Sequence, residues 1–247
     1  MKYICQQIIT RLIRSFVFIG ILGSSILFFA CTKNLSPHHK QHSHTNNPKD
    51  RINELQDNNQ KVYKGEASKS FLIVHTRLDL KPDFNNKTLD GESDLYLVPC
   101  CKSQDELSLD AVGLILKQIE IVESGNELTP EYDYDHKKIH IILNRPYNPI
   151  DTLHIKIEYI AQPEILADSG YVKKEDLKGL FFINPSGSNP SEPKELWSQG
   201  ETRCNSAWFP TIDEPNQKMT QEVRLTIDTS MVSLSNGELT YSTANTD

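Results

Sequence analysis

The 247-residue sequence lacks the short motifs that mark several common kinds of catalytic centre. It contains no G-x-S-x-G segment, which excludes the exposed serine turn of the α/β-hydrolases. It also contains no glycine-rich phosphate loop and no H-E-x-x-H pair of metal ligands. These residues by themselves therefore indicate neither nucleotide hydrolysis nor zinc-dependent hydrolysis.

Basic charge is also scarce and is nowhere concentrated. Acidic residues outnumber basic ones by 33 to 26, which gives a net charge of −7, and no run of five or six like charges occurs. Nucleic-acid binding depends on a basic patch or stripe, so the sequence predicts no nucleic-acid partner.

The five cysteines include no C-x-x-C spacing, which excludes a metal framework of that type. The adjacent Cys100 and Cys101 can bridge each other only with strain, because a disulfide normally joins separated Cα atoms. A link from either residue to Cys204 is left open. The interpretation we favour is three small thiols that are buried or half-buried.

Residues 1–30 have the pattern of a secretory signal. Lys2, Arg11 and Arg14 precede an apolar run over 16–30, and no acidic residue occurs among them. The run is shorter than the roughly 20 residues that a membrane-spanning helix needs, so cleavage is favoured over a permanent anchor. The end of the run, Phe28-Phe29-Ala30-Cys31, resembles a bacterial lipobox. We therefore expect lipidation of Cys31 and a membrane-anchored protein of the bacterial cell envelope, periplasmic or surface-facing.

Residues 31–68 are polar and have too few apolar side chains to build a core, so we predict a flexible tether. His38, His39, His42 and His44 lie within it and could bind a transition metal adventitiously. A solvated linker is the favoured interpretation, because no flanking elements hold these imidazoles in place.

From residue 69 onward the sequence changes to short alternating segments separated by turn residues, which predicts an all-β fold of antiparallel strands. Residues 110–116 could carry a helical turn. The expected strands lie at 71–80, 88–98, 106–109, 116–122, 138–143, 153–160, 179–185 and 220–228, with a final hairpin beginning at 232–239.

The carboxylates that follow are the candidate site residues. Asp213 and Glu214 precede Pro215, which favours a turn in which they cap backbone N–H groups. Glu201 comes two residues after Gln199, so the two side chains would share one face of an extended strand. Two adjacent acceptors of this kind could bind an ammonium group.

The folded region has four histidines, and we predict that none of them binds a metal. His75 and His154 lie in expected strands, while His136 and His140 are four residues apart. In a strand that spacing separates two side chains by about 13 Å, too far to share one ion.

Several short segments of the sequence together form one pattern. They are Gln199-x-Glu201, Phe209-Pro210-x-x-Asp213-Glu214-Pro215-x-x-Lys218, Ser235-Asn236-Gly237, Asp79-Leu80 and Thr88-Leu89-x-Gly91. The most specific part is Gln199-x-Glu201 followed by the longer block around two prolines. With these segments, residues 69–247 resemble the N-terminal domain of the zinc aminopeptidases related to aminopeptidase N.

The resemblance implies a saddle-like β-sandwich that covers one side of a thermolysin-like catalytic domain. It implies that Glu201 binds the free α-amino group of a peptide and that Gln199 lines the first specificity pocket. The family's zinc ligands and catalytic residues have no counterpart in these residues. We therefore expect no cofactor in this chain, zinc only in the full-length family, and a fragment that is inactive without a catalytic domain in cis or in trans.

A different class of function remains open at this point. The chain could be a stand-alone β-sandwich lipoprotein that binds peptides or a partner protein without catalysis.

Overall fold

The computed structural model describes residues 2–9, 69–168 and 179–245. The predicted lipidation residue Cys31, the apolar run of 16–30 and the tether of 31–68 lie outside the described residues. Within the described ranges, no helix is long and apolar enough to cross a membrane.

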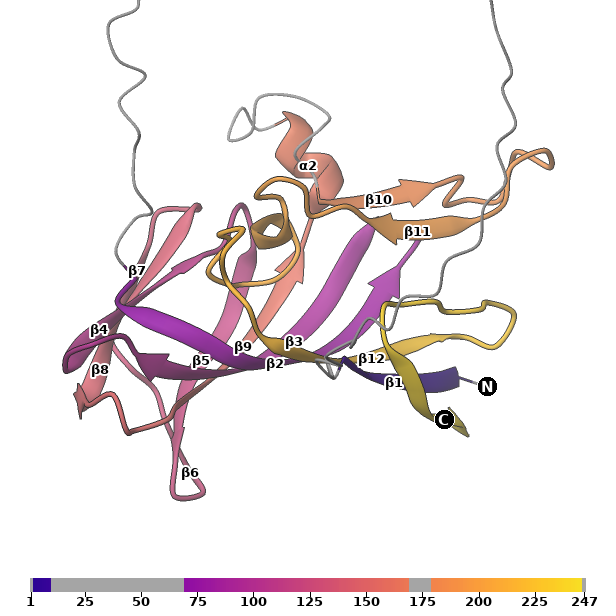
Figure 1. The fold of residues 1–247 in the computed structure, drawn as a ribbon. Coiled ribbons are helices and arrows are strands. Elements are labelled where there is room, and N and C mark those ends of the chain that lie inside the picture. The colour runs from indigo at the N-terminus through magenta and orange to yellow at the C-terminus, as the bar shows by residue number, and fades with distance from the viewer. Residues whose placement is uncertain (1, 10–68, 169–178, 246–247) are drawn as a thin grey trace, which may run out of the picture. The chain divides into compact units, whose positions relative to one another are not determined.

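The described residues are mostly β-strand, as predicted, and eight strands form the largest sheet (Figure 1). Adjacent strands of this sheet pair antiparallel, except that β12 and β2 run parallel to each other. In spatial order the strands are β13 (Glu238–Asn245), β1 (Lys2–Ile9), β12 (Thr220–Asp228), β2 (Phe71–Asp83), β3 (Thr88–Pro99), β9 (Leu153–Ala161), β5 (Ile115–Glu123) and β6 (Asn126–Leu128).

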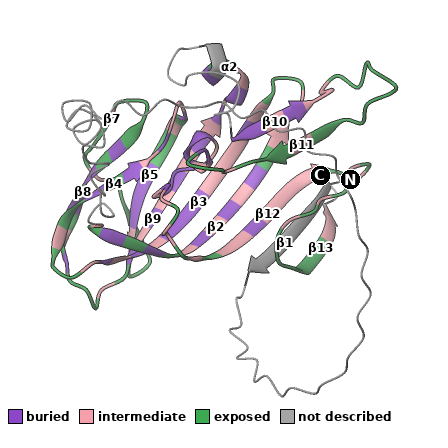
Figure 2. Ribbon diagram, turned by 45° about the horizontal axis from the view of Figure 1, so that its top comes forward, coloured by how far each residue is buried: buried purple, intermediate pink, exposed green. Residues whose placement is uncertain are grey.

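Buried apolar residues alternate with more exposed residues along the central strands, so the sheet has one apolar face. In β9, Leu153, Ile155, Ile157 and Tyr159 are fully buried, while the residues between them are half-buried (Figure 2). Because successive side chains of a strand point to opposite faces, this period-two pattern sends every second residue into the core. The predicted face of this strand is confirmed.

A second sheet of three strands closes the core at one end of the large sheet (Figure 1). It contains β4 (Gln104–Asp110), β8 (Lys138–Tyr147) and β7 (Tyr132–Tyr134). Leu109 of β4 and Ile139 of β8 are fully buried and belong to the same hydrophobic cluster as Ile155 of the large sheet. The arrangement is sandwich-like, which confirms the predicted class.

A two-stranded arm of β10 (Leu180–Ile183) and β11 (Glu195–Ser198) lies over the large sheet (Figure 1). Phe182 of β10 packs edge-on against Phe84, in the turn between β2 and β3, with ring centroids 5.4 Å apart. The arm is therefore fixed to the tip of the β2–β3 hairpin. A short helix, α2 (Pro163–Asp168), precedes the arm.

The suggested helical turn over 110–116 is wrong. Residues 111–114 form an irregular connection, because other segments use its backbone groups. The Tyr134 hydroxyl donates to the carbonyls of Ala111 and Leu114, both at 3.0 Å, and the Val112 N–H donates to the Ser206 carbonyl at 2.7 Å.

Two further expectations differ from the structure near the sheet edge. Val232 and Leu234 lie in the loop before β13, with 96% and 93% of their surfaces exposed, so the final strand begins later than predicted. Residues Lys2–Ile9, part of the expected signal, pair with both β12 and β13. Removal of residues 1–30 stays a prediction.

Candidate functional site

Gln199 and Glu201 lie on a loop directly after β11, and both side chains are exposed. The Gln199 N–H donates to the Gly179 carbonyl at 2.9 Å, which extends the pairing of the arm by one residue. Residues 201–204 then form a turn, closed by the Cys204 N–H on the Gly200 carbonyl at 3.1 Å. The assumption of an extended strand across these residues is therefore wrong, and both residues lie on a loop.

Close packing fixes the backbone of this loop. A Cβ atom on Gly200 would lie 2.2 Å from Asn205 Oδ1, and one on Gly179 would lie 1.9 Å from the Cys204 carbonyl oxygen. Gly179 also has a positive φ of 64°, which side chains rarely tolerate. The Cys204 thiol, which is buried, donates to the Glu201 carbonyl at 3.3 Å. Glu201 thus projects from a turn that has little freedom to move.

Asp213 has the capping role that the turn hypothesis predicted. Its Oδ2 accepts the N–H of Ser206 at 2.9 Å, within the short 3₁₀ helix Asn205–Ala207. Its Oδ1 accepts the Asn205 side-chain amide at 3.4 Å. Burial raises the pKa of Asp213, and the hydrogen bonds from Ser206 oppose that shift only in part. Asp213 is a structural acceptor and is not free to bind substrate.

Glu214 differs from the prediction, because its carboxylate forms an ion pair instead of a cap. Glu214 Oε2 lies 2.7 Å from a guanidinium nitrogen of Arg203, whose side chain is 62% exposed. This pair joins the two ends of the loop at its surface.

Asp110 at the end of β4 anchors the loop to the three-stranded sheet. The backbones of Asp110 and Thr211 exchange two hydrogen bonds, at 2.7 and 3.0 Å. The carboxylate of Asp110 also accepts the Asp213 N–H at 3.0 Å. Phe209 and Pro210 are buried beneath, so the Phe-Pro block serves packing. The sequence alone did not single out Asp110, because its partners are about a hundred residues further along the chain.

The strand histidines His75 and His154 have hydrogen-bond partners, as predicted. His154 Nε2 lies 2.6 Å from the buried Asp94, and His75 Nδ1 lies 2.8 Å from the Thr220 hydroxyl. Within the described ranges, no three or more His, Cys, Asp or Glu side chains are grouped to hold a metal. These residues do not fit the family's catalytic zinc, and we derive no zinc step from them.

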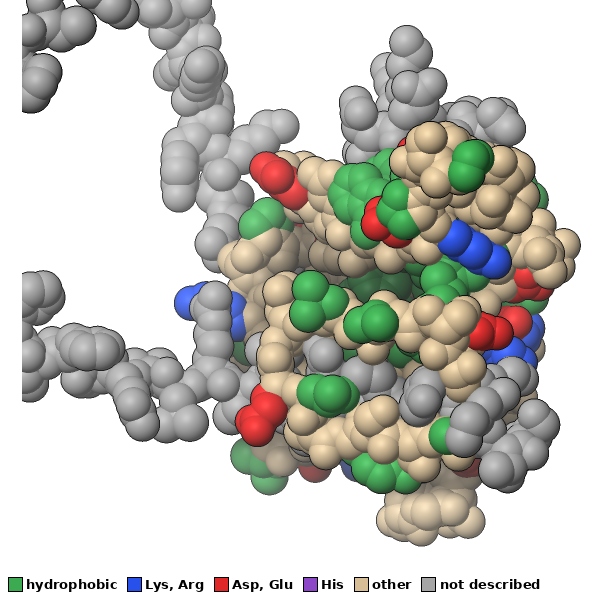
Figure 3. All heavy atoms as spheres, turned by 90° about the vertical axis from the view of Figure 1, so that its right-hand side faces the viewer, with side chains coloured by type: hydrophobic (Ala, Val, Ile, Leu, Met, Phe, Trp, Pro, Cys, Tyr) green, Lys and Arg blue, Asp and Glu red, His purple; other side chains and the backbone are tan. Residues whose placement is uncertain are grey.

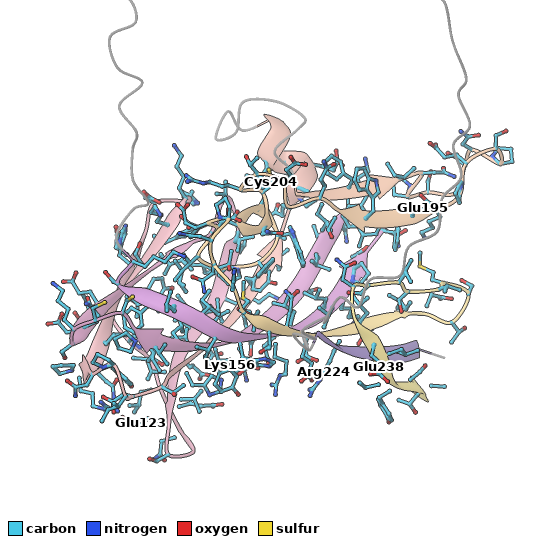
Figure 4. All side chains as sticks on the ribbon, in the orientation of Figure 1. Glu123, Lys156, Glu195, Cys204, Arg224 and Glu238 are labelled. Carbon is cyan, nitrogen blue, oxygen red and sulfur yellow. The ribbon has the colours of Figure 1, made fainter. Side chains whose placement is uncertain are left out.

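The two faces of the large sheet differ in chemistry. Figure 4 shows Cys204 on the side that carries the arm, while Lys156 and Arg224 project from the opposite side. That opposite side carries a network of ion pairs, among them Arg77 with Asp94 at 2.6 Å. Sequence reasoning missed this network, although charged residues alternate with apolar ones in β2 and β3.

Several apolar side chains are exposed on the arm, on the edge strand β13 and on the loop before it. Trp197 of β11 is 44% exposed and Leu239 of β13 is 55% exposed, in addition to Val232 and Leu234. Figure 3 shows hydrophobic side chains on this side of the molecule, around a hollow. Clusters of this kind commonly mark surfaces that contact another protein or domain.

The chain matches the family described as Peptidase M1 N-terminal domain over residues 45–247, and it belongs to that family. This confirms the predicted relationship to the N-terminal domain of the aminopeptidase N family. The match begins within the segment predicted to be a tether.

The chain is also similar to several solved structures. An M1 zinc metallopeptidase from Deinococcus radiodurans is 18% identical with a TM-score of 0.51, and the match covers 66% of this chain and 34% of that chain. A mutant of that enzyme bound to a Tyr-Ser-Ala substrate is 17% identical, with a TM-score of 0.49 and coverage of 64% and 32%. Leukotriene A4 hydrolase from Saccharomyces cerevisiae is 20% identical, with a TM-score of 0.48 and coverage of 63% and 23%. The chain thus spans about a third or less of these proteins.

Proposed function

We propose that this chain is the substrate-side domain of a zinc aminopeptidase that removes N-terminal residues from peptides. The observation that carries the proposal is the family match over residues 45–247, which includes the loop of Gln199 and Glu201. The family match supports the class of reaction, which is removal of N-terminal residues. In this proposal, Gln199 and Glu201 of the loop are the residues that contact the substrate.

In this proposal, Glu201 binds the α-ammonium group of the peptide. Its carboxylate is exposed on a turn whose backbone is fixed by Gly200 and Cys204, so little conformational entropy is lost when it binds. A charge-assisted hydrogen bond is stronger than a neutral one, and it strengthens further when water is excluded. Gln199 supplies a neutral acceptor and donor beside it, suited to lining the pocket of the first side chain.

Peptide hydrolysis requires a catalytic domain that these residues do not supply. The sequence contains no H-E-x-x-H pair, and M1 chains of known structure are about three times as long as the matched region or longer. We propose that such a domain acts in cis or in trans and covers the exposed apolar side chains of β13 and the loop before it, among them Val232, Leu234 and Leu239. The 247 residues alone should not hydrolyse aminoacyl substrates.

The location of the protein is part of the same proposal. A signal over 1–30 and a lipid on Cys31 would hold the domain at a membrane of the bacterial cell envelope. The support is the charge and apolar pattern of the N-terminal sequence.

The test is kinetic and uses this chain joined in frame to an M1 catalytic domain. In the joined protein the catalytic domain would partly bury the contact between Glu201 and the ammonium group, and loss of such a charge-assisted contact costs about 3 kcal/mol. Glu201→Ala should therefore lower kcat/KM on aminoacyl substrates about a hundredfold. Glu195→Ala is the matched control, because Glu195 is an exposed carboxylate on the same arm. It should leave kcat/KM within about twofold of the parent.

Gln199→Ala separates the binding of the amine, assigned to Glu201, from the selection of the first side chain, assigned to Gln199. It should change the ranking of substrates by their first side chain while the requirement for a free amine persists. If Glu201→Ala has the same kcat/KM as the parent, Glu201 does not recognise the amine.

A further inference from the structure

A pair of adjacent thiols lies at the open end of the β2–β3 hairpin. Cys100 follows the last residue of β3, and its N–H donates to the Ser70 carbonyl, just before β2, at 2.7 Å. The arm that carries the candidate site packs on Phe84, at the other end of the same hairpin. The thiol pair is thus separate from the site described above.

The local backbone presents both sulfur atoms on the same side. The Lys102 N–H donates to the Cys100 carbonyl at 3.0 Å, and Cys101 between them has a φ of 71°. Together these define a γ-turn of the rarer, positive-φ kind. The two Sγ atoms are 3.9 Å apart, and both thiols are free. A disulfide would need about 2.05 Å between them, so the pair is reduced in this geometry.

The distance between the two Sγ atoms matches the distance between two sulfur ligands of a tetrahedral metal ion. Zinc–sulfur bonds of about 2.3 Å at a tetrahedral angle place two sulfur atoms about 3.8 Å apart. Cys101 is exposed and Cys100 is half-buried, so an ion can reach both sulfur atoms from solvent. Soft thiolate ligands select thiophilic ions over hard ones.

We propose that Cys100 and Cys101 form a two-thiolate chelate for a thiophilic divalent metal ion. The remaining coordination positions are open to water or to a small external ligand. On binding, two S–H bonds break and two sulfur–metal bonds form, two protons pass to solvent, and the ion loses two waters without a change of oxidation state. This chelate is distinct from a catalytic zinc, which needs three protein ligands.

The test is a titration of the full chain with Cd²⁺ alone, under a phosphine reductant and without oxygen. The reference protein carries Cys5→Ser, Cys31→Ser and Cys204→Ser, so that only the pair remains. Its sulfur-to-cadmium charge-transfer absorption should saturate at one ion per chain. Imidazoles give no such band, so Cd²⁺ bound by the histidines of residues 38–44 does not contribute to this absorption.

Removing either thiol should abolish the chelate. Cys100→Ser and Cys101→Ser, each in the reference protein, should weaken Cd²⁺ binding about a hundredfold, because the second ligand no longer binds intramolecularly. Cys101→Gly removes the thiol at a position where glycine suits the positive φ, and circular dichroism checks that each variant is folded. Unchanged affinity in the folded single variants, or no charge-transfer band in the reference protein, would overturn the proposal.

Discussion

Substitution of Asp213 measures how strongly the candidate loop depends on a single buried carboxylate. Asp213 is 7% exposed and accepts the N–H of Ser206, which is also buried. Asp213→Ala leaves that N–H without its acceptor, which costs about 1–3 kcal/mol and somewhat more when the lost acceptor is charged. The loss of the Asn205 contact adds to this, so we expect a destabilisation of about 2–3 kcal/mol.

Asp213→Asn should cost less, because the amide oxygen can still accept the Ser206 N–H. Burial raises the pKa of Asp213 from its ordinary value of 3.8, which means that the charged form is disfavoured in the folded chain. The parent protein therefore loses stability as the pH rises from 3.8 through the folded pKa. The asparagine side chain does not titrate. The stability of the Asp213→Asn protein relative to the parent should therefore improve as the pH rises from 3.8 through the folded pKa of Asp213.

The assay is urea unfolding followed by circular dichroism, with the midpoint and slope both fitted. A loss of 2–3 kcal/mol corresponds to a fall in Tm of about 5–10 °C for a domain of this size. Glu214→Ala is the matched control, because it removes a neighbouring carboxylate from an exposed ion pair and should cost less than about 1 kcal/mol. Equal losses for Asp213→Ala and Glu214→Ala would refute the reasoning.

Three further predictions concern the sheet and the N-terminal segment. Gly91→Ala should cost about 1–3 kcal/mol in urea unfolding, because its Cβ would lie 2.3 Å from the ring of the fully buried Tyr159; an unchanged midpoint would contradict this. Burial acts to raise the pKa of Asp94, but the hydrogen bond with His154 and the charge of Arg77 outweigh it and lower the pKa below 3.8. Asp94 therefore stabilises the fold above that value, and Asp94→Asn should destabilise the protein near neutral pH with a difference that vanishes as the pH falls through the folded pKa. Cys31→Ser should release the protein from membranes in fractionation, because a lipid chain contributes about 0.8 kcal/mol per buried methylene, whereas full retention would point to an uncleaved anchor.

The strands of the core were predictable because their burial alternates strictly. The expected strand at 153–160 coincides with β9, and that at 138–143 lies within β8. The sequence could not reveal the parallel pairing of β12 with β2, because it depends on contacts between residues about 145 positions apart. It also could not reveal β1, since a basic, apolar N-terminus fits both a signal and a strand.

At the candidate site, the structural role of Asp213 was predictable from the sequence, but the path of the loop was not. The turn formed by Asp213 followed from the proline after Glu214, whereas the 3₁₀ helix that it caps did not. The loop of Gln199 and Glu201 is set by glycine contacts and by the Cys204 carbonyl, which are properties of the folded chain. Local propensity describes such a loop poorly, because tertiary packing determines its path.

The most direct test of amine recognition compares two inhibitors of the enzyme formed by this chain and an M1 catalytic domain. One is an amino-acid hydroxamate with a free α-amine, and the other is the same molecule with hydrogen in place of the amine. The parent and Glu195→Ala should bind the amine-bearing inhibitor about a hundredfold more tightly, which corresponds to about 3 kcal/mol. Glu201→Ala should bind the two with nearly equal affinity, and a preference that survives in Glu201→Ala would contradict the account.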